Sequence, residues 1–348
     1  MTTPAKAPLR VVVVEDSKVQ RAHLVRVLQA DGDIEVVGEA GDAVEAVRLT
    51  AELRPDVATI DLDILGGGGQ HAIEQIMGET PTPLLVLSAH VSSPANAPAV
   101  AALVGGALDA MPKPTTWTAA DEAEVRRRVR SLRGVTVLRH PRGRLASRTT
   151  TEPSPPTSGG RSRLVVIAAS TGGPAALAQL LAGLAGVSAP VLIVQHIHAQ
   201  FVDGLAAWMR RVAPLEVRIA THGEQPEPAV VYFGPPDVHL RVAGGLRIIL
   251  DPKPASMHRP SADQLFLSAA EHAGRSALGV VLTGMGDDGA RGLLAIRNRG
   301  GLTIAQDEAT SAVFGMPRAA EMSGAAVKVL PLAEIAAEIV DATTRRRA

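Results

Sequence analysis

Three polar positions in the second half of the chain carry side chains suited to nucleophilic catalysis. Each follows a short apolar run of the kind that forms a buried strand in a parallel sheet, and the residues are Ser170, His196 and the pair Asp287 and Asp288. A serine hydroxyl becomes an effective nucleophile when a neutral imidazole takes its proton and a carboxylate orients that imidazole. The order along the chain is free, because geometry defines such a triad. These residue types therefore predict acyl transfer.

The turn around Ser170 suits this chemistry. Gly172 and Gly173 follow the serine, and Pro174 is well placed in the first turn of a helix. Backbone N–H groups at a helix start favour a negatively charged oxygen beside the serine. The alternative is that Ser170 or Thr171 only caps the helix.

Two other ligand chemistries compete for the same residues. The stretch 284–289 reads Gly-Met-Gly-Asp-Asp-Gly, which fits a dinucleotide fingerprint, with Asp307 after the next strand. Two aspartates beside a pyrophosphate argue against that interpretation. His196 and His198, together with an Asp, could instead bind zinc, although this spacing is a weak signal.

Polar residues in the first half also follow apolar runs, and we expect them to meet at one edge of a parallel sheet. They are Glu15, Asp16, Asp61, Ser88 and Lys113. A cluster of carboxylates requires a compensating cation, and hard oxygen ligands favour Mg²⁺. Mg²⁺ beside a carboxylate and a lysine can neutralise a phosphoryl group during transfer. The alternative is a set of solvated loop acids.

Apolar strand-like runs alternate with helical periodicity in both halves, which predicts two α/β units with parallel sheets. We expect a first domain over 8–133 and a second over 162–345. The intervening 134–161 is rich in Pro, Ser, Thr and Arg and is predicted to be a flexible linker. Its arginines could instead dock an acidic partner or nucleic acid.

Composition excludes several classes of protein. The 348 residues include 35 basic and 35 acidic side chains, so the formal net charge of +0 gives no reason to expect a nucleic-acid partner. The absence of cysteine excludes disulfides, thiolate catalysis and Cys-ligated zinc. Without a signal peptide or an apolar run long enough to span a membrane, we expect a cytoplasmic protein with no membrane insertion.

Residues 9 to about 120 resemble the receiver domain of two-component response regulators, a flavodoxin-like fold. The resemblance rests on Val-Glu-Asp-Ser at 14–17, Asp61, Ser88 and Lys113-Pro114. It implies that a histidine kinase phosphorylates Asp61, that Ser88 and Lys113 form the switch, and that Mg²⁺ is held by Glu15, Asp16, Asp61 and the backbone carbonyl of Asp63. Two departures are the four glycines Gly66 to Gly69, expected to make that loop more mobile, and Ala110 at a position that is often aromatic.

Residues from about 163 to 343 resemble the catalytic domain of the chemotaxis protein-glutamate methylesterase/glutaminase (CheB) family, a doubly wound α/β fold. The matching stretches are 169–174, 194–196, 258–261, 282–286, 288–289, 306–308 and 314–317. The resemblance implies Ser170 as nucleophile, His196 as base and Asp288 as the orienting acid, with Thr171 and the N–H of Met285 supporting the site and no cofactor. His258 and Arg259 are the histidine and arginine best suited to contact substrate. Ile197-His198-Ala199 departs from the usual Met-Pro-Pro.

The resemblance also implies a function. The enzyme would demethylate glutamate γ-methyl esters on methyl-accepting chemotaxis receptors and deamidate glutamines, and its receiver would cover the active site until Asp61 is phosphorylated. Three alternatives remain: a catalytically silent regulatory binding protein, an esterase of a non-chemotaxis two-component pathway, and a DNA-binding response regulator. The last requires a basic output domain.

Overall fold

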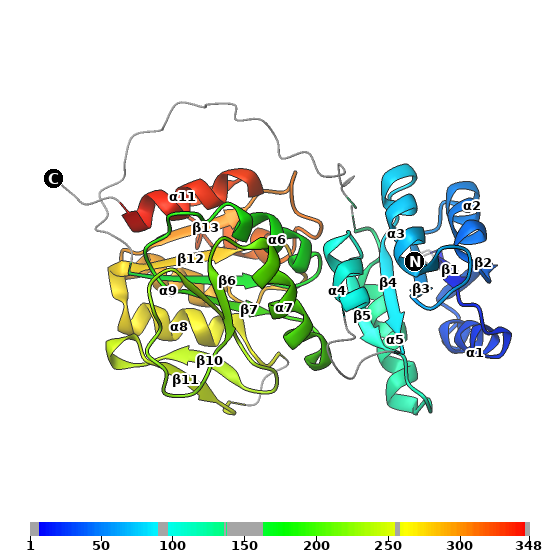
Figure 1. Ribbon diagram of the computed structural model, residues 1–348, viewed down its shortest axis with the longest axis horizontal. Coiled ribbons are helices and arrows are strands. Elements are labelled where there is room, and N and C mark those ends of the chain that lie inside the picture. Colours follow the sequence, from blue (N-terminus) through cyan, green and yellow to red (C-terminus); the bar gives the residue numbers. More distant parts are fainter. Residues whose placement is uncertain (1–6, 90–96, 136, 138–162, 255–257, 345–348) are drawn as a thin grey trace, which may run out of the picture. The chain divides into compact units, whose positions relative to one another are not determined.

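The computed structural model describes residues 7–89, 97–135, 137, 163–254 and 258–344, which form two compact units divided between Pro141 and Arg142 (Figure 1). Most of the predicted linker lies outside the described residues. The domain boundaries at 133 and 162 therefore stay predictions.

The first unit is a five-stranded parallel sheet in the order β2-β1-β3-β4-β5, with a helix after each strand. Its strands are β1 (Leu9–Val14), β2 (Ile34–Ala40), β3 (Val57–Asp61), β4 (Leu84–Ser88) and β5 (Asp109–Pro112), and its helices are α1 (Lys18–Gln29), α2 (Ala43–Leu53), α3 (Gly68–Glu79), α4 (Ala97–Val104) and α5 (Ala119–Ser131). The chain runs from β1 outward to β2 and then crosses to β3 on the other side. β1 and β3 therefore flank the point where the strand order reverses, the usual ligand position of such sheets.

The second unit is built on a seven-stranded parallel sheet and a two-stranded antiparallel ribbon. Its strands are β6 (Leu164–Ala169), β7 (Val191–Gln195), β8 (Glu216–Ile219), β9 (Val230–Phe233), β10 (His239–Val242), β11 (Ile248–Asp251), β12 (Ala277–Val281), β13 (Leu302–Gln306) and β14 (Lys328–Leu330). Its helices are α6 (Gly173–Ala182), α7 (Val202–Val212), α8 (Ala262–His272), α9 (Ala290–Asn298), α10 (Met316–Met322) and α11 (Leu332–Thr344).

The strand order β14-β13-β12-β6-β7-β9-β8 makes the second unit doubly wound. From β6 the chain moves to β7, then to the edge strand β8 and back to β9 between them. It then returns to β12 beside β6 and continues in the opposite direction. α6 packs with α7 and α11, whereas α8 packs with α9, and α9 with α10, so two groups of helices cover the sheet (Figure 1). The strand order reverses between β6 and β12. The predicted α/β fold class is thus confirmed for both units.

The core of the first unit is aliphatic, whereas that of the second also buries Phe201, Tyr232, Phe233 and Phe266. β6 and β12 are buried along their whole length, because the central strands of a parallel sheet are covered on both faces. Among the described residues, no helix is long and apolar enough to cross a membrane.

Candidate active site and acidic pocket

Ser170 follows β6 directly and lies at the reversal point between β6 and β12. Its N–H donates to the carbonyl of Thr283, which follows β12 closely, over 3.0 Å, and its carbonyl accepts from the N–H of Gly173. Gly172 occupies the N-cap position of α6, and no side chain caps this helix. Ser170 is therefore not the N-cap of this helix, and its hydroxyl is not used for that purpose.

The backbone after β12 approaches Ser170 closely. A Cβ added at Gly284 would lie 2.7 Å from the Ser170 Cβ and 2.4 Å from the Met316 sulfur. Only glycine fits this position without displacing the serine. The glycine of the apparent dinucleotide fingerprint thus allows close packing against Ser170.

His196 is held beside Ser170 by backbone and side-chain bonds. Its N–H donates to Ala169 O over 2.9 Å. The side-chain nitrogen of Gln195, the last residue of β7, donates to both Ser170 O and His196 O at 2.9 Å. The two loops that carry the proposed nucleophile and base are therefore tied together by one buried amide.

The His196 ring contacts Asp288. Its Nε2 lies 3.0 Å from Asp288 Oδ2, although the ring N–H does not point straight at that oxygen, and Nδ1 has no hydrogen-bond partner among the described residues. The His196 side chain is 8% exposed and that of Asp288 14% exposed. A mostly buried imidazole with one nitrogen on a carboxylate and the other unpaired is the arrangement that a general base requires.

Asp288 accepts three further hydrogen bonds from the start of α8. They come from Ser261 Oγ at 2.9 Å, the Ala262 N–H at 2.8 Å and the Asp263 N–H at 2.9 Å. Burial alone would raise the pKa of Asp288, but the adjacent His196 imidazole and the backbone donors outweigh it and hold the pKa well below its ordinary value. Asp288 is therefore an anion at neutral pH.

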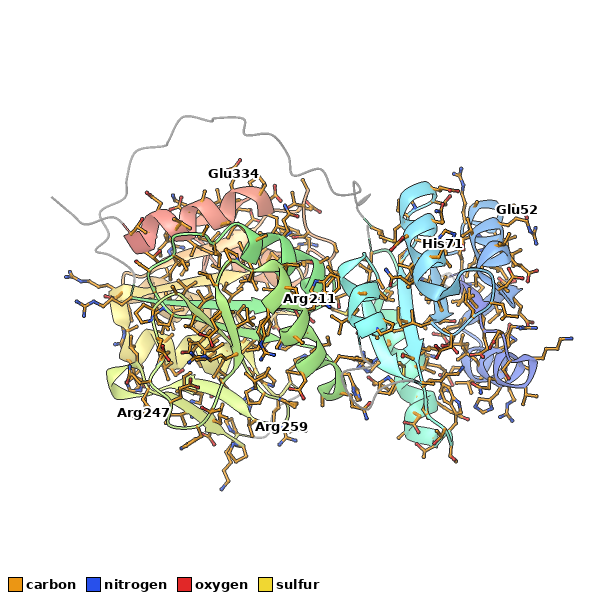
Figure 2. All side chains as sticks on the ribbon, viewed as in Figure 1. Glu52, His71, Arg211, Arg247, Arg259 and Glu334 are labelled. Carbon is orange, nitrogen blue, oxygen red and sulfur yellow. The ribbon has the colours of Figure 1, made fainter. Side chains whose placement is uncertain are left out.

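The two predicted substrate contacts differ in their surroundings. The His258 ring stacks on the His196 ring, with centroids 4.3 Å apart and planes 11° apart. Arg259 is exposed and its side chain is drawn at the surface of the second unit (Figure 2). His258 thus contacts the proposed base directly, whereas the guanidinium of Arg259 is available to solvent.

Backbone N–H groups near Ser170 provide candidate oxyanion donors. Among the described residues, the N–H groups of Thr171, Gly172 and Met285 donate to no hydrogen bond. The hydroxyl of Thr283 donates to Thr171 O at 3.0 Å and accepts from the Val313 N–H, which fixes the turn. Donors held by such a turn without a partner can stabilise a developing negative charge.

The geometry does not support the alternatives of dinucleotide binding and zinc binding. The Asp307 carboxylate accepts from the N–H and hydroxyl of Thr310 and so closes its own turn. His198 Nδ1 accepts from the Gln200 N–H. In the ranges that the structure describes, no group of His196, His198 and an aspartate has metal-binding geometry.

The acidic pocket of the first unit lies between β1 and β3. Glu15 and Asp61 are buried, and Lys113 Nζ lies 2.5 Å from Glu15 Oε2 and 2.5 Å from Asp61 Oδ2. Burial raises the pKa of Glu15 despite the lysine. Burial would lower the pKa of Lys113, but its bonds to Asp61 and Glu15 raise the pKa above its ordinary value.

The acidic pocket fits a divalent cation. Carboxylate oxygens of Glu15, Asp16 and Asp61 lie within 4.8 Å of one another, and Asp16 is exposed, which leaves a path from solvent. The N–H of Asp63 donates to Asp61 Oδ1. Ser88 is buried at the end of β4, and its carbonyl accepts from the Lys113 N–H. A single ammonium facing two buried carboxylates leaves the pocket short of positive charge, as an Mg²⁺ site requires.

Models of known protein families match both units of the chain. A family model described as "CheB methylesterase" matches residues 165–339, and one described as "Response regulator receiver domain" matches 11–123. The chain belongs to the CheB methylesterase family.

Similar proteins span nearly the whole chain. A protein-glutamate methylesterase/protein-glutamine glutaminase 2 of Anaeromyxobacter dehalogenans is 45% identical over 333 residues, covering 94% of this chain and 95% of that protein. One from Pyrococcus abyssi is 37% identical, covering 96% and 93%. The crystal structure of the Thermotoga maritima CheB methylesterase catalytic domain is 35% identical, with a TM-score of 0.50, and covers 53% of this chain and 99% of that one.

Two positions depart from the usual receiver pattern. The loop 66–69 adopts a backbone that requires glycine. Gly66, Gly67 and Gly68 have positive φ angles, and a Cβ at Gly69 would lie 2.4 Å from Asp61 O. These glycines permit a turn packed against the backbone of Asp61. Ala110 is fully buried in β5.

Sequence reasoning assigned no role to three residues that brace this CheB site. They are Gln195, Ser261 and Thr283. Each lies within a stretch that resembles the family, but their hydrogen bonds run to backbone or to residues distant in the chain. Only spacing relative to a strand end, as for Gln195 directly before His196, could have drawn attention to them.

Proposed function

We propose that this chain is a phosphorylation-regulated protein-glutamate methylesterase that also deamidates protein glutamines. The observation that carries the proposal is the convergence of Ser170, His196 and Asp288 where the strand order reverses, with His196 Nε2 3.0 Å from Asp288 Oδ2. The names of the relatives supply the reaction class, hydrolysis of methyl esters of protein glutamate and of protein glutamine amides. We take methyl-accepting chemotaxis receptors as the substrate, as the family resemblance implies.

In the proposed reaction, His196 removes the proton from Ser170 Oγ, which attacks the γ-carbonyl of the methylated glutamate. The N–H groups of Thr171 and Met285 stabilise the oxyanion. The imidazolium, stabilised by anionic Asp288, protonates the departing methanol. Water activated by His196 then hydrolyses the acyl-enzyme, and a glutamine substrate releases ammonia by the same path. His258 and Arg259 border the substrate.

The receiver supplies the proposed control. Asp61 accepts a phosphoryl group from a histidine kinase, with Lys113 and the Ser88 hydroxyl near the phosphoryl oxygens. Glu15, Asp16, Asp61 and the Asp63 carbonyl would hold Mg²⁺, whose charge would balance that of the phosphoryl group. Phosphorylation shifts the protein toward its active state. We place this enzyme in the cytoplasm, without a cofactor in the esterase and without a nucleic-acid partner.

The test is methanol release from a radiolabelled, methylated receptor fragment. We expect the full chain to release methanol faster with a small-molecule phosphodonor and Mg²⁺, Asp61→Asn to ignore the phosphodonor, and Ser170→Ala to release none above background. Release that survives Ser170→Ala would refute the nucleophile. No release from several receptor fragments would favour a silent binding protein or a substrate outside chemotaxis.

A further inference from the structure

Ser261 occupies the N-cap position of α8 but does not cap that helix. A serine at this position usually accepts a hydrogen bond from the first turn of its own helix. Here the hydroxyl makes no cap bond and donates instead to Asp288 Oδ1 at 2.9 Å. The N–H groups of Ala262 and Asp263 bind the Asp288 carboxylate in its place. The Asp288 carboxylate thus accepts the helix N–H groups that a capping side chain would bind, and the Ser261 hydroxyl donates to the same carboxylate.

The backbone of Ser261 is anchored from behind. Its N–H donates to His239 Nδ1 over 3.1 Å, and His239 Nε2 lies 2.7 Å from Pro254 O. An Nδ1 that accepts and an Nε2 that faces a carbonyl define a neutral imidazole protonated at Nε2. Because His239 is completely buried and Ser261 is 6% exposed, the hydroxyl has little freedom to turn away from Asp288.

The segment 258–261 contacts both His196 and Asp288 of the proposed triad. His258, at its start, stacks on the His196 ring, and Ser261, at its end, binds Asp288. A carboxylate can rotate about its Cβ–Cγ bond, so a bond at Oδ1 orients Oδ2 as well. Oδ2 is the atom that lies 3.0 Å from His196 Nε2.

We propose that Ser261 is a positioning residue, which acts through Asp288 to orient His196. The inference rests on the proposed function only for the roles of Asp288 and His196. The Ser261 hydroxyl contacts neither substrate nor reacting atoms.

The test compares three variants of the full chain. Ser261→Ala removes the donor, Ser261→Thr keeps a hydroxyl, and Ser268→Ala is the matched control. Ser268 is also buried on α8, but its hydroxyl donates to Leu265 O and accepts from the Val242 N–H, away from the site. We expect Ser261→Ala to lower kcat by about 10- to 100-fold with KM unchanged, the range known for side chains that orient metal ligands through a hydrogen bond. Ser261→Thr should retain most of the activity.

Thermal melting separates positioning from loss of fold. Ser268→Ala should lower Tm and leave kcat at the wild-type value. A Ser261→Ala enzyme with wild-type kcat would overturn the proposal. So would an equal loss in the Ala and Thr variants, or a loss of kcat in Ser268→Ala as large as that in Ser261→Ala.

A second readout does not depend on the natural substrate. A fluorophosphonate reacts when Ser170 Oγ displaces fluoride from phosphorus, which forms the Ser–O–P bond and releases the serine proton with fluoride. The labelling rate, measured by intact mass, should fall in Ser261→Ala by a factor similar to that for kcat. Ser261-dependent labelling without methanol release would refute the proposed substrate and support the positioning role. Methanol release and labelling that both ignore Ser261 would refute the positioning role and leave the proposed function standing.

Discussion

The two units place polar side chains at equivalent points of their sheets, but the charges of these side chains are balanced differently. In each, functional side chains gather where the strand order reverses, between β1 and β3 in the receiver and between β6 and β12 in the catalytic unit. The receiver pocket collects carboxylates around one lysine and is short of positive charge. In the catalytic unit, the Asp288 carboxylate instead binds the N–H groups at the start of α8 and lies against His196.

This difference shows what the sheet determines and what its surroundings add. Parallel strands bring loop residues to one edge in both units. Whether that edge binds a cation or activates a serine depends on which backbone and side-chain donors satisfy the acids. We expect a cation where two buried carboxylates share one ammonium, as at Glu15 and Asp61, and none at Asp288, which accepts several N–H and O–H donors.

The largest expected effect distinguishes the two adjacent aspartates. Asp288→Asn should lower kcat for methanol release by about 10⁴-fold, because an amide cannot support the imidazolium as a carboxylate does. Asp287→Asn is the matched control, since Asp287 is exposed, and should leave kcat nearly unchanged. Phosphorylation of Asp61 should be normal in both variants. Equal losses in the two variants would contradict the assignment of Asp288.

The second prediction concerns the charge balance of the receiver. Lys113→Met leaves Glu15 and Asp61 buried together without their ammonium, and the receiver's free energy of unfolding should fall by about 3–5 kcal/mol in EDTA. Added Mg²⁺ should restore part of this loss by replacing the missing charge. Denaturant unfolding with and without Mg²⁺ measures both effects. An unchanged midpoint in EDTA would contradict the proposed imbalance.

A matched pair of glycine substitutions tests close packing at the two reversal points. Gly69→Ala would press on Asp61 O, and Gly284→Ala on Ser170 and Met316. Each should destabilise its own unit by about 1–3 kcal/mol, the usual cost of overpacking. Gly69→Ala should slow phosphorylation, and Gly284→Ala should slow ester hydrolysis.

Gly78→Ala provides the control for this pair. A Cβ at Gly78, within α3, meets nothing within 4 Å, so alanine should stabilise that helix slightly. Unfolding midpoints and the two activities measure the pattern. If Gly69→Ala affected neither phosphorylation nor receiver stability, the close packing of residue 69 against Asp61 O would not matter for either property.

The smallest effect is an opposite pH dependence in the two units. Asp288 has a native pKa below its ordinary value near 3.8, so its contribution to stability is present above that value and lost as the pH falls toward the native pKa. Glu15 has a native pKa raised above its ordinary 4.5 by burial. The native state therefore holds its proton more tightly, and stability falls as the pH rises from 4.5 toward the native pKa.

Unfolding measured without Mg²⁺ from strongly acidic to neutral pH tests these signs. Glu15→Gln should stabilise the receiver at neutral pH, whereas Asp288→Asn should destabilise the catalytic unit at the same pH. Destabilisation by Glu15→Gln at neutral pH in EDTA would reverse the sign and refute the role of burial.

Sequence alone predicted the elements with the strongest patterns. The apolar run from Leu9 to Val14 is β1 and the helical period from Ala290 to Asn298 is α9, because both patterns are strong and local. The pattern did not predict β8 and β14, whose residues Glu216, Arg218 and Lys328 break the apolar run. These strands lie at the two edges of the sheet, where partial exposure tolerates charge.

The site residues also divide into those that the sequence predicted and contacts that only the tertiary structure shows. Residue types after apolar runs were enough to predict an acidic cluster and a serine site, because parallel strands bring such positions together. Only the tertiary structure decided which donors meet each group. Asp288 receives the first N–H groups of α8, a helix that begins 26 residues earlier in the chain at Ala262. The contacts from Ser261 and Gln195 likewise depend on packing between distant segments, which no local pattern of residues encodes.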